Sequence, residues 1–84
     1  MKSGNRMKRI RYLIMEHLPA DGRHVMVEDL QQNVSLDAQY LNVDYTKHLF
    51  DNILTQLVED QYVVNLGGKI IATKYGLIKS NIFC

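Results

Sequence analysis

The stretch that decides the fold is residues 44–76, which read DYTKHLFDNILTQLVEDQYVVNLGGKIIATKYG. Its first half carries apolar pairs four residues apart, at 49–50, 53–54 and 57–58. Pairs at this spacing place a broad apolar stripe along one face of a helix. Asp44 precedes the stripe, and its carboxylate can accept hydrogen bonds from the free N–H groups of a first helical turn. We therefore predict an amphipathic helix over residues 44–60.

The second half of the stretch changes to a period of two after Gln61. Tyr62, Val64 and Leu66 fall on one side of an extended chain, which is the pattern of a strand. The dipeptide at 67–68 is Gly-Gly, which accepts the positive φ angles of a tight hairpin turn. Residues 69–72 then read as the returning strand, so we predict a β-hairpin after the helix.

Three weaker elements precede the helix. Residues 6–18 place Met7, Ile10, Leu13, Ile14 and His17 on one helical face and end before Pro19. Residues 23–26 read as a short strand that pairs with the hairpin, and residues 27–33 begin a second helix. The segment 34–43 stays open between two interpretations: one extra helical turn capped by Ser35, or a plain loop.

Together these elements predict an α+β fold in the order helix, strand, helix, helix, strand, strand. Residues 73–76 close the domain, and Leu77 and Ile78 are expected to pack back on the first helix, with room for a short C-terminal helical turn. We expect a single domain over residues 6–78, with flexible tails at 1–5 and 79–84, because 84 residues suffice for only one domain.

The charges are distributed unevenly along a chain whose net charge is only +1. Residues 1–11 carry five basic residues and no acid, residues 12–60 carry all nine acids against two basic residues, and residues 61–84 carry three lysines. A basic start, an acidic middle and a basic hairpin make a polarised molecule, which indicates a charged partner.

Two motifs resemble winged-helix domains of the broad class that includes the MarR-like and PadR-like transcription regulators. They are ILTQLVEDQYV at 53–63 and IATKYG at 71–76. The resemblance covers residues 6–78 and implies a small DNA-binding protein that regulates transcription. Helix 44–60 would enter the major groove of double-stranded DNA, the wing at 66–69 would touch the backbone, and a homodimer would read a pseudo-palindromic site. Gln61 departs from the pattern, since glycine usually occupies this position.

The candidate DNA contacts combine phosphate-binding and base-reading residue types. They are Tyr45, Lys47, His48, Asn52, Lys69, Arg6 and Arg9.

A second interpretation starts from the carboxylates of Asp44, Asp51 and Glu59, which share the outer face of the helix and would repel phosphates. On this view the chain is a winged-helix protein-interaction module. It would be a phage or plasmid accessory protein that binds or inhibits a host nucleic-acid-binding protein through its acidic surface.

The residues do not assemble an enzyme or a metal site. Nothing pairs a nucleophile with a base, and His17, His24, His48 and Cys84 lack the spacing of a zinc site. We predict that His17 is a partly buried histidine with a hydrogen-bond partner. We also expect no cofactor, no membrane segment and a cytoplasmic location, because there is no apolar run of spanning length, no signal-peptide core and only one cysteine.

Overall fold

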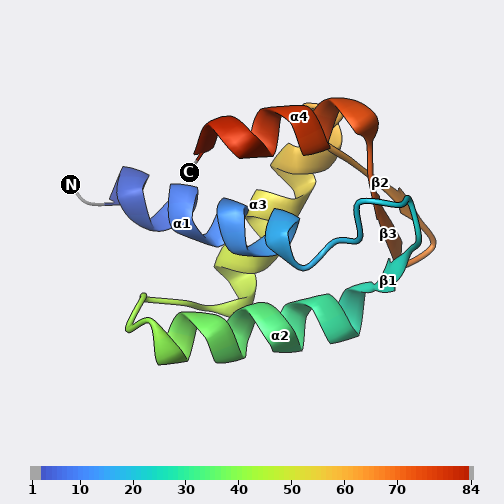
Figure 1. Cartoon of the computed structure of the whole chain (residues 1–84). Helices are drawn as coiled ribbons and strands as arrows, with labels where there is room; N and C mark the ends of the chain where they lie inside the picture. The colour runs from blue at the N-terminus through green and yellow to red at the C-terminus, as the bar shows by residue number, and fades with distance from the viewer. Residues whose placement is uncertain (1–2, 84) are drawn as a thin grey trace.

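Four helices lie beside a small antiparallel sheet at one end of the molecule (Figure 1). The computed structural model describes residues 3–83, with side chains for residues 6–78. The elements are, in chain order, α1 (Ser3–Glu16), β1 (Val25–Met26), α2 (Val27–Tyr40), α3 (Lys47–Glu59), β2 (Val63–Leu66), β3 (Lys69–Ala72) and α4 (Lys74–Phe83). The predicted α+β class and the small antiparallel sheet are confirmed, and the arrangement is compatible with a winged-helix-like fold.

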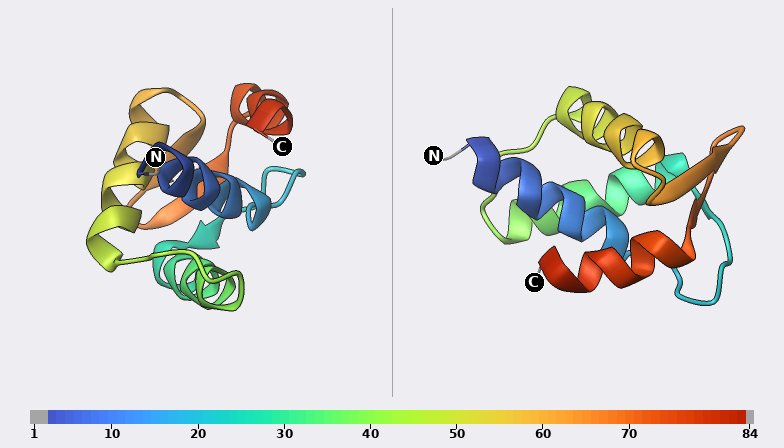
Figure 2. Two further views of the ribbon diagram at one scale, coloured as in Figure 1. Left: turned by 90° about the vertical axis from the view of Figure 1, so that its left-hand side faces the viewer. Right: turned by 90° about the horizontal axis from the view of Figure 1, so that it is seen from above.

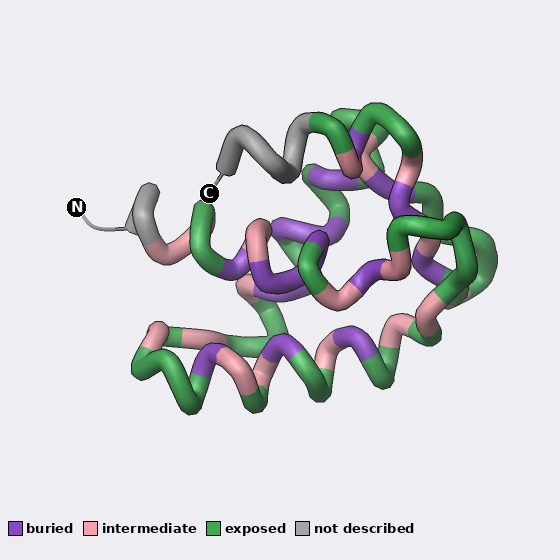
Figure 3. Tube along the Cα trace, viewed as in Figure 1, coloured by how far each residue is buried: buried purple, intermediate pink, exposed green. Residues whose placement is uncertain are grey.

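The core lies where α1 meets α2 and α3, and the buried segments of these helices face one another (Figure 3). The apolar stripe predicted for α3 supplies four buried residues, Phe50, Ile53, Leu54 and Leu57. Val58, which completes the last apolar pair, is 37% exposed. Among residues 6–78 every side chain that is buried as a whole is apolar, so hydrophobic contact is the main source of stability.

The sheet has the strand order β1-β3-β2 and confirms the predicted hairpin. Gly67 and Gly68 form the two-residue turn with φ angles of +63° and +94°, the left-handed region that glycine adopts without a steric penalty. The predicted pairing of the first strand with the hairpin is also observed, since Val25 lies opposite Ile70. Figure 2 shows the hairpin projecting from the helical body.

The segment 34–43, for which two interpretations were left open above, is helical as far as Tyr40. Helix α2 is therefore twice as long as the seven residues expected at 27–33. Val34 and Ala38 continue the buried face begun by Leu30, and this packing keeps the segment helical. The helix ends in a Schellman motif. Asn42 adopts φ +61°, its N–H donates to the Gln39 carbonyl at 3.2 Å, and the next N–H donates to the Ala38 carbonyl at 2.8 Å.

The prediction that α3 begins at Asp44 is wrong. The helix begins at Lys47, and its N-cap is Thr46, whose Oγ1 accepts from the Leu49 N–H at 3.0 Å. Thr46 has the extended conformation that an N-cap requires, with φ −137° and ψ 156°. The Asp44 side chain lies outside the helix and is 90% exposed.

A second Schellman motif ends α3 at Gln61. The Gln61 N–H donates to the Val58 carbonyl at 3.0 Å, and the Tyr62 N–H donates to the Leu57 carbonyl at 2.8 Å. Gln61 has φ +67°, which explains why glycine usually occupies this position in the families that the motif resembles.

The Thr-x-x-Gly motif at 73–76 begins α4. The Thr73 hydroxyl donates to the Gln61 carbonyl at 2.7 Å and accepts from the Gly76 N–H at 2.9 Å, so it joins the end of α3 to the start of α4. A Cβ at Gly76 would lie 2.0 Å from the Tyr62 carbonyl oxygen, so only glycine fits there.

The expected tails are partly helical. Helix α4 continues to Phe83, far beyond a short helical turn, and residues 79–83 belong to it. Helix α1 likewise begins at Ser3, within the expected amino-terminal tail. The physical reason is that α4 packs against α1, a contact between the two ends of the chain. Residues 1, 2 and 84 lie outside the described residues.

Candidate nucleic-acid interface

The outward face of α3 is polar along its whole length. Its exposed members are Lys47, His48, Asp51, Asn52, Thr55, Gln56 and Glu59. The face forms because the apolar stripe turns inward onto α1, which leaves the opposite side to solvent. Lys47, His48 and Asn52, three of the predicted DNA contacts, therefore lie together on the first two turns.

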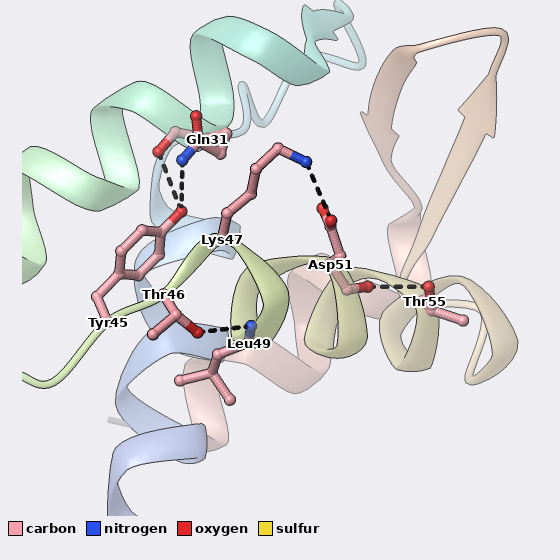
Figure 4. A network of polar contacts seen from close by, with 7 residues as sticks. All are labelled: Gln31, Tyr45, Thr46, Lys47, Leu49, Asp51 and Thr55. Carbon is pink, nitrogen blue, oxygen red and sulfur yellow. Dashed lines mark hydrogen bonds and ion pairs between the residues drawn. The ribbon is translucent and has the colours of Figure 1, made fainter.

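Lys47 is held by an ion pair on the same helix face. Its Nζ lies 3.1 Å from the Asp51 Oδ2, one turn later (Figure 4). The backbone carbonyl of Asp51 accepts from the Thr55 hydroxyl at 2.9 Å. Both charged side chains are more than half exposed, so the pair contributes only about 0.3–0.5 kcal/mol. A phosphate could therefore compete with Asp51 for the lysine.

The Tyr45 side chain joins α2 to the start of α3. Its hydroxyl accepts from the Gln31 Nε2 at 3.0 Å and donates to the Gln31 carbonyl at 3.4 Å (Figure 4). The ring lies half-buried, with its centroid 6.5 Å from that of Phe50. Burial raises the pKa of the Tyr45 hydroxyl above its ordinary value of 10.0, the hydrogen bond from Gln31 lowers it, Asp51 raises it and Lys47 lowers it. Contact of Tyr45 with DNA stays a prediction, and it would require this hydroxyl to be shared.

Arg6 reaches the start of α3 from α1. One of its terminal nitrogens, Nη1, lies 3.9 Å from the Asp44 Oδ2, and its Nε is buried with no hydrogen-bond partner among the described residues. A pocket of about 360 Å³ separates the two elements and is lined by Arg6, Asp44, Tyr45, Thr46 and Leu49. The structure thus brings Arg6 beside Tyr45, although the two are far apart in the sequence.

The remaining two predicted contacts lie farther away. Arg9 is exposed on α1, one turn after Arg6. Lys69 is exposed at the start of β3, directly after the hairpin turn. The predicted set therefore divides into three groups: Lys47, His48 and Asn52 on the outward face of α3, Arg6 beside Tyr45 at its start, and the two outlying basic residues.

Exposed carboxylates interrupt this basic surface. Asp44 precedes α3, Asp51 lies in its middle, and Glu59 and Asp60 lie at its end. The carboxylates are spread along the helix, whereas its one lysine lies in the first turn. The amino-terminal end of α3 is consequently the end that can best approach a phosphate backbone.

Polar contacts between distant residues were not identified from the sequence, and two of them reach α2. One is the Tyr45–Gln31 pair. The other joins the residue after α1 to α2: the Nε2 of His17 lies 2.6 Å from the Asp37 Oδ2. His17 was predicted to be a partly buried histidine with a partner, and this is confirmed. The identity of Asp37 as that partner had no local signal, since twenty residues separate the two.

Within residues 3–83 no group of three histidine, cysteine or acidic side chains could hold a metal ion. No helix of that range combines the length and apolar character needed to cross a bilayer.

Comparison with protein-family models, with curated proteins and with solved structures found no match.

Proposed function

We propose that this chain is a winged-helix DNA-binding protein with a role in transcription regulation, in which α3 is the recognition helix and the β2–β3 hairpin is the wing. The succession of helix, strand, two helices and hairpin supports the assignment. Helix α3 also has the required amphipathic form, with one face in the core and the other in solvent.

The observation that carries the proposal is the cluster of DNA-compatible side chains at the start of α3. Asn52 is a residue type that reads adenine, and the basic groups of Lys47 and Arg6 suit phosphate. The N–H groups of the first turn add the positive end of the helix dipole. On this proposal the first two turns of α3 contact DNA, and the acidic last turn stays away from the backbone.

Salt dependence gives the first test. If Arg6, Arg9, Lys47 and Lys69 each neutralise one phosphate, the logarithm of the affinity should fall with the logarithm of salt concentration with a slope of roughly −3 to −4. Fluorescence anisotropy with labelled mixed-sequence duplex DNA measures this slope. No binding at low salt, or binding that ignores salt, would refute the proposal.

A second candidate function is suggested by the carboxylates that lie exposed around α3, at Asp44, Asp51, Glu59 and Asp60. These acids form a surface that suits a basic protein, including a nucleic-acid-binding protein whose DNA they would imitate. This candidate uses the same helix face as DNA binding but requires the opposite charge on the partner.

Replacement of one carboxylate separates the two functions by the sign of its effect. Asp51→Asn removes the charge that holds Lys47 and preserves the helix surface. If α3 approaches phosphates, binding to duplex DNA should tighten about threefold at low salt, because two unit charges about 7 Å apart in water repel by roughly 0.6 kcal/mol. If the face binds a basic protein, the same change should weaken capture of that partner.

Asp21→Asn is the matched control, since it removes the same charge from the exposed turn between α1 and β1. The Asp21 Oδ1 accepts from the Arg23 N–H at 3.2 Å, and an asparagine oxygen retains that acceptor. The control should leave the affinity for DNA within experimental error. Weaker DNA binding by Asp51→Asn would contradict the proposed orientation of α3.

A further inference from the structure

Strand β2 forms one edge of the sheet, because the strand order is β1-β3-β2 (Figure 1). It packs mainly against β3 on one side and against the end of α3. An edge strand offers a row of backbone donors and acceptors that another strand can pair with.

A hydrogen bond between Thr73 and Tyr62 establishes which backbone groups of β2 face outward. The Thr73 N–H donates to the Tyr62 carbonyl at 3.0 Å, so residue 62 belongs to the set that bonds to β3. Alternation along an antiparallel ladder then assigns Val64 and Leu66 to the same set. The backbone groups of Val63 and Asn65 therefore point away from β3, toward the free edge.

The hydrogen bonds between β3 and β1 show independently which backbone groups of β3 face β2. The Val27 N–H donates to the Gly68 carbonyl at 2.8 Å, so residues 68 and 70 of the hairpin bond to β1. Residues 69 and 71 must then bond to β2, opposite Leu66 and Val64. Both observations leave one donor and one acceptor outward on each of Val63 and Asn65.

Apart from its short length of four residues, strand β2 carries none of the features that normally protect an edge. Its sequence, Val63-Val64-Asn65-Leu66, contains no charge and no proline, and its register opposite β3 is continuous, without a bulge. The outer face of the sheet is apolar as well. Val64 is 40% exposed and Leu66 is 58% exposed.

We propose that a second copy of this chain pairs with β2 edge to edge, in antiparallel orientation about a two-fold axis at Val64. Val63 of each copy then lies opposite Asn65 of the other, and the two pairs exchange four main-chain hydrogen bonds. The two Val64 side chains meet across the axis, and Leu66 of each copy packs on Tyr62 of the other. The two three-stranded sheets become one of six strands.

The free edge of β2 is complementary to an identical edge, and this favours a second copy of the chain as its partner. The free edge offers two residues, and an identical antiparallel edge satisfies both with apolar side-chain pairs and no like-charge contact. The charges flanking the strand also suit this arrangement. Asp60 precedes β2 and Lys69 follows it, so antiparallel pairing brings the lysine of each copy to the end that holds the aspartate of the other. The interface leaves the outer face of α3 unused, and of the proposed DNA contacts it draws only on Lys69 of the wing. The inference goes beyond the proposed function and is tested without DNA.

Sedimentation velocity of the full chain over a concentration series, without DNA, tests the inference. We expect a monomer–dimer equilibrium, and Val64→Lys should raise the dimer dissociation constant about tenfold or more, because it sets two like charges opposite each other at the axis. Leu36→Lys is the matched control, since Leu36 is 55% exposed on α2, away from the hairpin. It should leave the equilibrium unchanged.

Cross-linking gives a second measurement that does not depend on a destabilising change. In a Cys84→Ser background, Val64→Cys should form an intermolecular disulfide under mild oxidation, because side chains paired across the axis have Cβ atoms about 5 Å apart. Leu36→Cys in the same background should not. The proposal would be overturned if the wild-type chain stays monomeric throughout or forms assemblies larger than a dimer. It would also be overturned by a dimer that Val64→Lys does not weaken, or by equal cross-linking of both cysteine variants.

Discussion

The left-handed residue at the end of α3 allows a stabilising substitution, Gln61→Gly. Gln61 is exposed and has φ +67°, and its N–H and the Tyr62 N–H close the Schellman motif with bonds of 3.0 and 2.8 Å. All of these interactions use the backbone, so glycine retains them. The substitution removes only the contact between Cβ and the backbone that makes this conformation unfavourable.

The expected gain is the difference of two opposing effects. A left-handed residue with a side chain costs about 1–2 kcal/mol, whereas glycine loses about 0.5–1 kcal/mol more backbone entropy on folding. Gln61→Gly should therefore raise the free energy of unfolding by about 0.5–1 kcal/mol. For a domain of this size the Tm should rise by roughly 2–8 °C.

Urea and thermal unfolding followed by far-UV circular dichroism measure the change, and two further glycine variants calibrate it. Gln56→Gly, in the right-handed middle of α3, should lower the free energy of unfolding by about 0.5–1 kcal/mol. Asn42→Gly, at φ +61° after α2, should give a gain below about 0.5 kcal/mol, because asparagine tolerates this conformation. If Gln61→Gly destabilises the protein as much as Gln56→Gly does, α3 does not end as described.

Three other substitutions test contacts that join distant parts of the chain. Gly76→Ala should lower the free energy of unfolding, measured in urea, by roughly 3 kcal/mol, because the new Cβ would meet the Tyr62 carbonyl oxygen at 2.0 Å. Stability near that of the wild type would show that α4 does not approach the Tyr62 backbone so closely. Thr73→Val should cost about 1–2 kcal/mol by losing the hydroxyl that caps α4, whereas Thr73→Ser should retain most of the stability; equal losses would refute the capping role. Tyr45→Phe should cost about 0.5–1.5 kcal/mol at neutral pH by losing its bonds to α2. Because folding raises the pKa of Tyr45, the contribution of this residue to stability is present below pH 10 and is lost as the pH rises above that value. The Tm of the phenylalanine variant should therefore decline less steeply at alkaline pH than that of the wild type. An unchanged decline would contradict the raised pKa.

Local sequence patterns were sufficient for the central part of the fold. The four-residue spacing from Leu49 to Leu57 predicted the apolar side of α3, because the geometry of a helix alone determines which residues share a face. The Gly-Gly pair predicted the hairpin turn for a similarly local reason, since two consecutive positive φ angles exclude most other residues. The polar residues at the start of α3 could be proposed as DNA contacts on the same basis, and that role awaits the titration described above.

The tertiary structure decided the features that depend on contacts between distant residues. The segment after Asn33 is helical because Val34 and Ala38 pack in the core, and residues 79–83 belong to α4, which packs on α1. The outer face of α3 illustrates the same division. The composition of that face was readable in the chain, but only the fold placed Arg6 near the start of the helix and bound the Tyr45 hydroxyl to α2. Helical and strand periodicities report which side of an element is apolar, whereas the partner that covers that side is selected by packing of the whole chain.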